Sequence, residues 1–416
     1  MLCSMNAVSV TPTGQPIRAT IALTSSKSES NRALILDALT GFRCHLHNLS
    51  SARDTQTMIR LLRTDDATAD VLDAGTTMRF LTAYFALTGQ TKTMTGTPRM
   101  CERPIGLLVE ALRALGADIA YLGKDGYPPL QTRGFQSTGL QELSIRGDVS
   151  SQYISALAML APYLPTGLTL NLTGTLGSVP YITMTLQQMA AFGVRPEADW
   201  GAQRIHIPAG TYQPTDYTIE SDWSGASYWF SVVALADEAD IELLGLKDES
   251  LQGDSAIVGI MDQLGVQATY TGKGYRLTKK AAAGQLTVDF TNCPDLAQTV
   301  AVCAAIKGIP ATFTGIESLK IKETDRVLAL QTELRKFGAD LVEVEPNHRY
   351  EVRAANAPQP DAAPVRIDTY DDHRMAMAFA PIAARYPVII EEPGVVAKSY
   401  PSFWEDFSTV AGVTAL

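Results

Sequence analysis

The feature that most constrains the fold is a sixfold internal repeat. A Ser, Thr or Asp residue precedes an apolar, Ala-rich segment of helical length at intervals of roughly 75 residues, the first interval being shorter. The six positions are Ser28, Thr76, Ser150, Ser224, Asp295 and Asp372. Because the side-chain oxygens of these residue types accept hydrogen bonds from free backbone N–H groups, the pattern predicts six helices with capped N-termini.

A second series of residues supports the same repeat. Gly116, Gly193, Gly265 and Gly338 each follow a Leu or Phe that ends a helix-like segment, and a strand-like stretch comes next. Glycine in this position typically closes a helix in the left-handed conformation. These glycines fall at a nearly constant distance after the capping positions, so we expect six related α/β units.

The first helix of each unit is expected to be buried. The segment 224–236, SGASYWFSVVALA, is apolar on every side, and such a helix belongs inside a shell of other elements. If equivalent helices pack in parallel, their N-termini meet, and the partial positive charge and free N–H groups there form an anion site. For any single capping residue, simple stabilisation of its helix remains the alternative.

Basic residues cluster around the predicted helix starts and in the connections between them. They are Lys27, Arg32, Arg79 and Arg374 beside the helix starts, and Arg103, Lys322, Arg326 and Lys398 in the connections. Since Arg binds phosphate and carboxylate groups through two parallel hydrogen bonds, this arrangement indicates a ligand with several anionic groups. A solvated, charged helix end is the alternative for the segment KETDR, taken alone.

Composition excludes several classes of function. The chain of 416 residues carries 34 Lys and Arg against 44 Asp and Glu, a net charge of −10, which argues against nucleic acid or an anionic membrane as the main partner. Apolar runs such as 154–164 are too short to span a bilayer, and the N-terminus lacks the pattern of a signal peptide. Five scattered cysteines without a CxxC motif predict reduced thiols and a cytoplasmic location.

Familiar cofactor and metal motifs are absent from the sequence. It contains no GxGxxG, P-loop or GxSxG pattern, and nothing nearby completes a zinc site around His45 and His47. We therefore expect neither a metal nor a cofactor.

Eight motifs together resemble one enzyme family. They are SKSESNRA, DAGTTMR, PRMCERPIG, SSQYISA, GSVPYI, KETDR, YDDHRMAM and AKSYPSF. In content and order they resemble the 5-enolpyruvylshikimate-3-phosphate (EPSP) synthases, or 3-phosphoshikimate 1-carboxyvinyltransferases, over essentially the whole chain. The resemblance implies an α/β fold of two similar domains, each of three βαβαββ units with buried parallel helices, described as an inside-out α/β barrel.

The resemblance also implies a reaction and a division of the chain. Enolpyruvyl would pass from phosphoenolpyruvate to the 5-hydroxyl of shikimate 3-phosphate, releasing phosphate, in the synthesis of chorismate and aromatic amino acids, a step that glyphosate inhibits. The expected domains are 1–20 with 221–416, on the phosphoenolpyruvate side with the catalytic carboxylates, and 21–220, on the shikimate 3-phosphate side, with the active site in the cleft between them. A cytoplasmic monomer with these two small-molecule partners is expected.

Site residues carry over from the matching motifs. Shikimate 3-phosphate is expected to contact Lys27, Ser28, Arg32, Ser150, Ser151, Gln152, Ser178, Tyr181, Asp295 and Lys322. Phosphoenolpyruvate is expected to contact Lys27, Gly75, Arg103, Gln152, Arg326, Arg374 and Lys398, with Arg79 supporting its pocket. The catalytic group is expected to be Asp295, Glu323, Lys27 and Lys322. Two residues depart from the family pattern, Asp73 and Ser318, where many or some members have Asn.

The chemistry explains the need for these residue types. A proton must leave the attacking hydroxyl and another must reach the methylene carbon, which requires a base and an acid, and the phosphates and carboxylates require cations. Asp295 is the candidate base and Glu323 the candidate acid.

The sequence leaves two alternatives open. One is the sister enzyme that transfers enolpyruvyl to UDP-N-acetylglucosamine, which typically uses a loop cysteine as its acid; Cys101, near Arg103, keeps that interpretation open. The other is a catalytically silent anion-binding module of the same fold.

Overall fold

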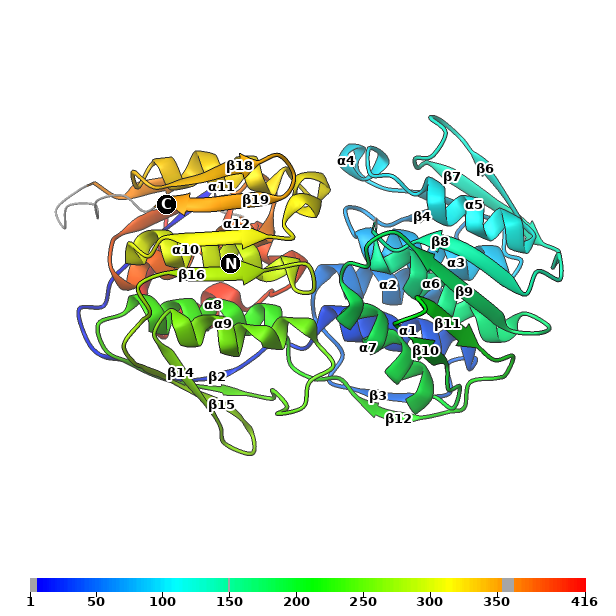
Figure 1. Cartoon of the computed structure of the whole chain (residues 1–416), viewed down its shortest axis with the longest axis horizontal. Helices are drawn as coiled ribbons and strands as arrows, with labels where there is room; N and C mark the ends of the chain where they lie inside the picture. The colour runs from blue at the N-terminus through cyan, green and yellow to red at the C-terminus, as the bar shows by residue number, and fades with distance from the viewer. Residues whose placement is uncertain (1–5, 149, 354–362) are drawn as a thin grey trace. The chain divides into compact units, whose positions relative to one another are not determined.

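The computed structural model describes residues 6–148, 150–353 and 363–416, and the chain divides into two compact units (Figure 1). The split unit comprises Met1–Ser25 with Glu220–Leu416, and the inserted unit comprises Ser26–Ile219. The resemblance places the division at residues 21 and 220, and the two units of the structure divide after residues 25 and 219. The first motif, SKSESNRA, begins at Ser26 and therefore belongs to the inserted unit.

The described residues of the split unit form three four-stranded sheets. In sheet order, the strands are β20 (Val365–Ile367), β21 (Val388–Glu391), β1 (Ala7–Thr11) and β22 (Gly412–Ala415); β14 (Val266–Tyr270), β15 (Gly274–Lys279), β13 (Ala239–Leu244) and β2 (Ile17–Ala22); and β16 (Leu286–Asp289), β17 (Ala311–Thr314), β19 (Arg349–Arg353) and β18 (Asp340–Glu345). Its helices are α8 (Trp223–Leu235), α9 (Ile257–Gln263), α10 (Ala297–Lys307), α11 (Arg326–Arg335), α12 (His373–Phe379) and α13 (Phe403–Phe407). Short 3₁₀ helices are η3 (Gly253–Ala256), η4 (Pro294–Leu296), η5 (Glu317–Ile321), η6 (Ala380–Ala384) and η7 (Pro393–Lys398).

In the inserted unit, the part of the chain that the structure describes forms two four-stranded sheets and one smaller, two-stranded sheet. In sheet order, the strands are β4 (Thr68–Asp70), β5 (Lys92–Thr95), β7 (Leu130–Phe135) and β6 (Ala117–Tyr121); β10 (Glu197–Asp199), β11 (Arg204–Ile207), β9 (Leu168–Thr173) and β8 (Glu142–Arg146); and β12 (Asp216–Thr218) with β3 (His45–His47). Its helices are α1 (Lys27–Leu39), α2 (Arg53–Arg63), α3 (Gly75–Leu87), α4 (Pro98–Cys101), α5 (Gly106–Leu115), α6 (Ser151–Leu160) and α7 (Val179–Ala191), with η2 (Ala161–Tyr163) after α6.

The repeat predicted from the sequence is visible in the sheets. In β16-α10-β17-α11-β18-β19, the first two strands pair in parallel across a helix, and the last two add antiparallel strands. The same mixed pattern recurs in β4-α3-β5-α5-β6-β7 and in β8-α6-β9-α7-β10-β11. The α/β prediction is confirmed. All these sheets are open, and none closes into a barrel among the described residues.

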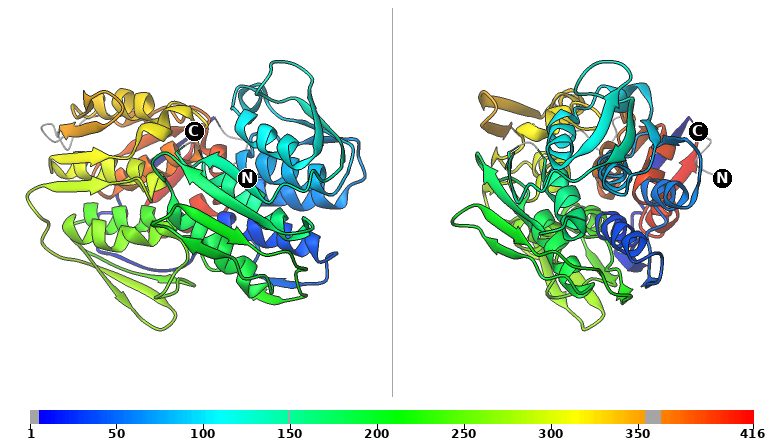
Figure 2. Two further views of the ribbon diagram at one scale, coloured as in Figure 1. Left: turned by 45° about the vertical axis from the view of Figure 1, so that its right-hand side comes forward. Right: turned by 90° about the vertical axis from the view of Figure 1, so that its right-hand side faces the viewer.

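The first helix of each repeat forms the core, as its composition predicts. In α8, α10 and α12 almost every residue is buried, and α3 and α6 are similar. Figure 1 shows α8, α10 and α12 in the middle of the split unit, with strands of its sheets around them, and Figure 2 shows the same unit from two further directions. This order of layers follows from helices that are apolar on all sides, since only a shell of sheets can remove such helices from water.

The C-terminal ends of two core helices are closed by cations. Lys307 Nζ donates to the Ala234 carbonyl of α8 at 2.8 Å, and Arg385 Nε donates to the Leu235 carbonyl at 3.1 Å. Arg385 Nη1 also reaches the Ile306 carbonyl of α10, at 3.4 Å. These cations stabilise the negative ends of the helix dipoles and bring the C-termini of α8 and α10 to the same end of the split unit.

The predicted caps are only partly correct. Ser150 and Asp372 cap α6 and α12 as expected, accepting from the backbone N–H groups of Gln152 and Arg374. In α1 and α8 the cap lies two residues earlier than predicted, at Ser26 and Asp222, because those side chains reach the first free N–H groups.

Thr76 and Asp295 do not cap their helices, which corrects the prediction. Thr76 lies inside α3, and its hydroxyl accepts from Gln152 Nε2 at 3.1 Å. Asp295 lies in η4, before α10, where arginine side chains hold its carboxylate. In both cases a partner distant in sequence takes the oxygen that a cap would use.

The glycine prediction is confirmed. Gly116, Gly193, Gly265 and Gly338 have φ angles of 115°, 95°, 92° and 71°, the left-handed conformation that glycine adopts without steric cost.

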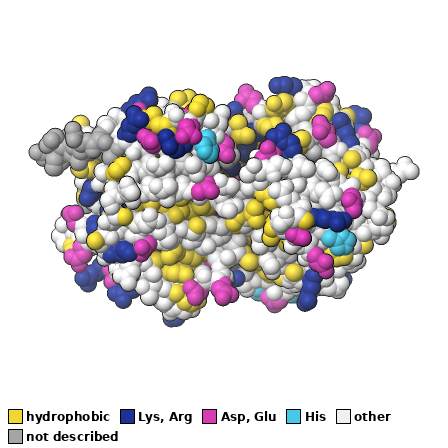
Figure 3. All heavy atoms as spheres, viewed as in Figure 1, with side chains coloured by type: hydrophobic (Ala, Val, Ile, Leu, Met, Phe, Trp, Pro, Cys, Tyr) yellow, Lys and Arg dark blue, Asp and Glu magenta, His cyan; other side chains and the backbone are white. Residues whose placement is uncertain are grey.

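The surface agrees with the charge balance of the sequence. On the face in Figure 3, Lys and Arg side chains lie among Asp and Glu side chains, an arrangement that does not favour a polyanionic partner. Among the described residues, no helix combines the length and the apolar character that crossing a bilayer requires.

Candidate active site

The N-terminal ends of three core helices of the split unit meet at a cluster of carboxylates and cations. Ser224 lies in the first turn of α8, Asp295 lies in η4 just before α10, and Arg374 lies in the first turn of α12. Arg374 Nη2 contacts both of the others, at 2.8 Å from Asp295 Oδ2 and 3.5 Å from Ser224 Oγ. The convergence predicted from the repeat is therefore present in this unit.

Arg326, the first residue of α11, joins three carboxylates. Its Nη1 lies 3.2 Å from Asp295 Oδ1, its Nη2 lies 2.9 Å from Glu323 Oε2, and its Nε lies 2.7 Å from Asp372 Oδ2. The side chains of Arg326 and Asp372 are 2% and 0% exposed. Burial alone would lower the pKa of Arg326, but the three carboxylates outweigh it and raise that pKa, so this charge is permanent.

Asp295 is held between two guanidinium groups. Burial would raise the pKa of its carboxyl, but Arg374, Lys322 and Arg326 together lower it below its ordinary value. Arg374 also lies near the Tyr228 hydroxyl, whose pKa burial raises to about 12. Asp295 is consequently ionised at neutral pH.

Glu323 also bridges two cations. In addition to Arg326, it faces Lys398, whose Nζ lies 3.7 Å from Glu323 Oε1 and whose side chain is 1% exposed. Lys398 ends η7, so the last part of the chain completes the cluster. The structure thus brings together Asp295, Lys322, Glu323, Arg326, Arg374 and Lys398 of the predicted residues.

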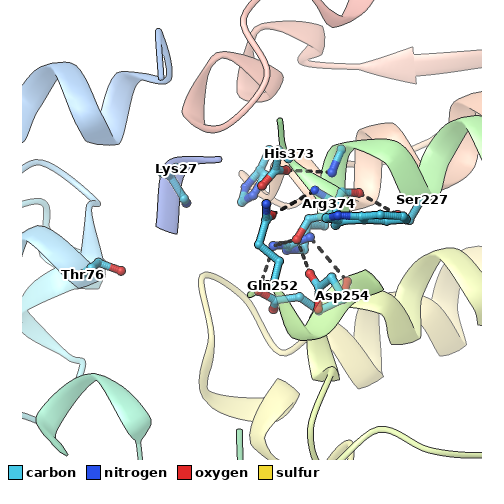
Figure 4. A network of polar contacts seen from close by, with 12 residues as sticks. Lys27, Thr76, Ser227, Gln252, Asp254, His373 and Arg374 are labelled. Atoms are coloured by element: carbon cyan, nitrogen blue, oxygen red, sulfur yellow. Dashed lines mark hydrogen bonds and ion pairs between the residues drawn. The ribbon is translucent and has the colours of Figure 1, made fainter. Parts of the chain in front are cut away.

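Asp254 is a member of this cluster that sequence reasoning missed. It lies in η3 and is 2% exposed, and its Oδ2 accepts from Ser224 Oγ; Figure 4 shows it in the polar network of Arg374. Burial, and then the nearby charge of Asp295, raise the pKa of Asp254 to about 7. A lone Asp in a short 3₁₀ helix carries no sequence signal, and only its burial distinguishes Asp254.

In the inserted unit, Lys27 and Arg32 project from α1. Lys27 Nζ contacts Asp54 Oδ2 at 3.0 Å, and Asp54 is a second residue that the sequence did not indicate. Arg32 donates to Thr185 Oγ1 at 2.6 Å, to the Ser28 carbonyl at 3.0 Å and to the Tyr181 carbonyl at 3.2 Å. Burial lowers the pKa of Arg32 to about 10. Arg32 thus connects α1 to α7 by hydrogen bonds and contacts two other predicted positions, Ser28 and Tyr181.

A second group in the inserted unit surrounds the start of α3. Arg79 donates to the Gly75 carbonyl at 2.9 Å and to the Pro104 carbonyl at 3.2 Å. A Cβ atom on Gly75 would lie 2.8 Å from Nη1 of Arg103 and 2.8 Å from Nη1 of Arg79. Gly75 therefore permits two guanidinium groups to approach the backbone at the N-terminus of a helix.

The remaining predicted residues lie at helix starts of the inserted unit. Ser150 and Ser151 begin α6, and Gln152 Nε2 reaches Thr76 at the start of α3. Ser178 precedes α7 with φ of 55°, an uncommon left-handed conformation for a serine. Two residues differ from the family pattern. Ser318 lies in η5. Both carboxylate oxygens of Asp73 lie 3.0 Å from Arg53 Nη2, so that a cation compensates the additional negative charge.

Known proteins of similar sequence identify the family of this chain. The family model for EPSP synthase (3-phosphoshikimate 1-carboxyvinyltransferase) matches residues 11–72 and 64–407. The chain belongs to the EPSP synthase family. A 3-phosphoshikimate 1-carboxyvinyltransferase of Bacteroides fragilis is 49% identical over 393 residues, 94% of each chain, and one of Neisseria meningitidis is 36% identical over 95% of this chain and 96% of the relative.

Solved structures support the same fold. An EPSP synthase from Acinetobacter baumannii aligns with a TM-score of 0.76 at 19% identity, covering 98% of this chain and 100% of that one. The predicted family and fold are confirmed, and the sister family that acts on UDP-N-acetylglucosamine is not favoured. Cys101, which had kept that alternative open, lies in the short helix α4, and its thiol points to the Gly96 carbonyl at 3.8 Å.

Asp254 generates a prediction about stability and pH. Its folded-state pKa of about 7 lies above the ordinary value of about 4 for an unfolded Asp, so between these values only the folded state holds the proton. The free energy by which this proton stabilises the folded state is complete below pH ~4 and is lost as the pH rises through ~7. For a difference of three pKa units it amounts to up to about 4 kcal/mol. Asn cannot ionise, so Asp254→Asn should gain in melting temperature relative to the parent as the pH rises from 5 to 8.

The control is Asp262→Asn, which changes an exposed carboxylate paired with Lys280 and should follow the parent across the series. Identical pH profiles for Asp254→Asn and the parent, recorded by differential scanning calorimetry, would contradict the prediction.

Proposed function

We propose that this chain transfers the enolpyruvyl group of phosphoenolpyruvate to the 5-hydroxyl of shikimate 3-phosphate, releasing phosphate, as a cytoplasmic monomer without a metal or cofactor. The observation that carries the proposal is the shared contact of Asp295 and Glu323 with Arg326. One buried cation holds two carboxylates in a single cluster, and a reaction that removes one proton and delivers another needs such a pair. Family membership supports the identity of the substrates.

In the proposed reaction, Asp295 accepts the proton of the 5-hydroxyl as its oxygen attacks C2 of phosphoenolpyruvate. Glu323 protonates the methylene carbon, giving a tetrahedral ketal phosphate. Elimination then reverses that protonation and expels phosphate. Lys27 and Lys322 stabilise the charge that develops on the reacting groups.

Binding of the anionic substrate would also change the pKa of the proposed base, Asp295. In the described structure Arg374 donates to Asp295 and holds its pKa below the ordinary value. A phosphate or carboxylate that draws these donors away would allow the pKa of Asp295 to rise toward the range of an effective general base. Substrate binding and activation of the base are thus coupled through one guanidinium group.

We assign the other predicted contacts to the two substrates as follows. Shikimate 3-phosphate contacts Lys27, Ser28, Arg32, Ser150, Ser151, Gln152, Ser178, Tyr181, Asp295 and Lys322. Phosphoenolpyruvate contacts Lys27, Gly75, Arg103, Gln152, Arg326, Arg374 and Lys398, supported by Arg79. The assignment gives five arginine or lysine side chains to a substrate that carries one phosphate and one carboxylate, which fits the preference of these side chains for such groups.

The acceptor is tested by phosphate release. Purified protein with phosphoenolpyruvate should release inorganic phosphate when shikimate 3-phosphate is added and should release none with UDP-N-acetylglucosamine. If protein that melts cooperatively releases no phosphate with either of the two acceptors, the proposed function is refuted.

The acid–base assignment is tested by amide variants. Asp295→Asn and Glu323→Gln preserve shape but remove proton transfer, which typically contributes ~10²–10⁴-fold in rate, so single-turnover rates should fall by that order. Binding of shikimate 3-phosphate, measured by calorimetry, should persist. If Asp295→Asn loses affinity and keeps its single-turnover rate, Asp295 is a binding group. Exchange of the phosphoenolpyruvate methylene protons with solvent should nearly vanish in Glu323→Gln; persistent exchange would assign the acid role to Lys322.

Gly75 tests the contacts of phosphoenolpyruvate. An added methyl group at Gly75 would displace the far ends of two flexible arginine side chains, so Gly75→Ala should weaken phosphoenolpyruvate binding roughly tenfold. Stability should change little, because the preference of helices for Ala over Gly, up to ~1 kcal/mol, offsets the weakened hydrogen bonds of Arg79. Gly259→Ala in α9, where a Cβ meets no atom within 4 Å, is the matched control. Equal dissociation constants of phosphoenolpyruvate for the parent and the two variants would argue against placing this substrate beside Gly75.

A further inference from the structure

The segment that leads into α12 holds an unusual backbone. Tyr370 and Asp371 both have φ of 55°, so two successive non-glycine residues occupy the left-handed region. Asp tolerates this conformation, but for a bulky residue such as Tyr it is a conformational outlier that must be compensated elsewhere. Strained residues of this kind concentrate at sites where the surrounding structure fixes a functional geometry.

The compensation is visible on α11. Glu333 is fully buried, and its Oε1 accepts from the Tyr370 hydroxyl at 2.8 Å. Its Oε2 accepts from the backbone N–H of Asp368 at 3.2 Å and contacts Lys336 Nζ at 2.6 Å. One carboxylate thus fixes the loop 368–371 at two points, and Lys336 balances its charge.

The strained pair lies directly before the residues of the cluster. Asp372 accepts from the Arg374 backbone N–H at 2.9 Å, which caps α12, and its other oxygen contacts Arg326 Nε at 2.7 Å. Rotation of the backbone at Tyr370 or Asp371 would therefore move Asp372, and with it the guanidinium group of Arg326 and the start of α12, which carries Arg374. Helix α11 holds this segment twice, through Arg326 at its start and through Glu333 two turns later.

We propose that Glu333 and Tyr370 are positioning residues that set the orientation of Arg374 and Arg326 for the carboxylate or phosphate of phosphoenolpyruvate. Neither residue touches substrate in this proposal, which rests on the function proposed above. Their bond keeps the loop in a conformation that Tyr would not adopt by itself, so that the guanidinium groups are oriented before the anion arrives.

The test is Tyr370→Phe, which removes one hydroxyl group and keeps the ring. Loss of a hydrogen bond to a buried carboxylate should weaken phosphoenolpyruvate binding about tenfold, while the dissociation constant of shikimate 3-phosphate stays unchanged. Tyr275→Phe is the matched control, since its hydroxyl also contacts a carboxylate, Asp248, at 2.8 Å but lies on β15. It should leave both dissociation constants unchanged. Calorimetry with each substrate supplies the readout, and melting temperatures report stability separately.

A second variant covers the case in which Tyr370→Phe does not fold. Glu333→Gln keeps an acceptor for the tyrosine hydroxyl and removes the charge, and it should show the same selective loss in smaller degree. Unchanged phosphoenolpyruvate affinity in the variants that fold, or equal losses for the two substrates, would overturn the inference. Because the parent is measured first, a parent that binds neither substrate refutes the proposed function, whereas a parent that binds both while Tyr370→Phe binds equally well refutes only the positioning role.

Discussion

The contact between Arg326 and Asp372 is the interaction on which the candidate site depends. Both side chains are almost completely buried, and Nε and Oδ2 lie 2.7 Å apart. The same guanidinium group holds Asp295 and Glu323, and the same carboxylate caps α12. Removing either partner would leave an uncompensated charge in a buried position, which typically costs ~3–5 kcal/mol, so the pair fixes α11, α12 and both candidate proton-transfer groups in one arrangement.

The core helices supply the electrostatic setting for this contact. In the split unit, α8, α10 and α12 begin at the cluster, while Lys307 and Arg385 neutralise the carbonyl ends of α8 and α10. The positive ends of the helix dipoles therefore face the region where an anion would bind, and the negative ends are capped. This arrangement explains how a chain with a net charge of −10 can still bind multiply charged anions.

The arginine side chains of the site already have hydrogen-bond partners in the described structure. Arg326 and Arg374 are engaged with carboxylates, and Arg32 is engaged with a hydroxyl group and backbone carbonyls. An anionic substrate would compete for some of these donors, and the pKa of Asp295 responds to how strongly they are withdrawn. This coupling fits the EPSP synthase family, whose reaction binds two anionic substrates and transfers two protons.

The sequence by itself determined the repeat, the buried helices, the left-handed glycines and the family, because periodicity, local capping chemistry and contiguous motifs are properties of neighbouring residues. It also indicated the cationic residues. It misplaced the caps at Thr76 and Asp295, whose oxygens are taken by Gln152 and by two arginines far away in the chain. It did not indicate Asp254, Asp54 or Glu333, because an isolated acidic residue has no local signature. Their roles arise from burial and from partners on other elements, and only the packing of the helices decides which carboxylates lose water and which cation each one meets.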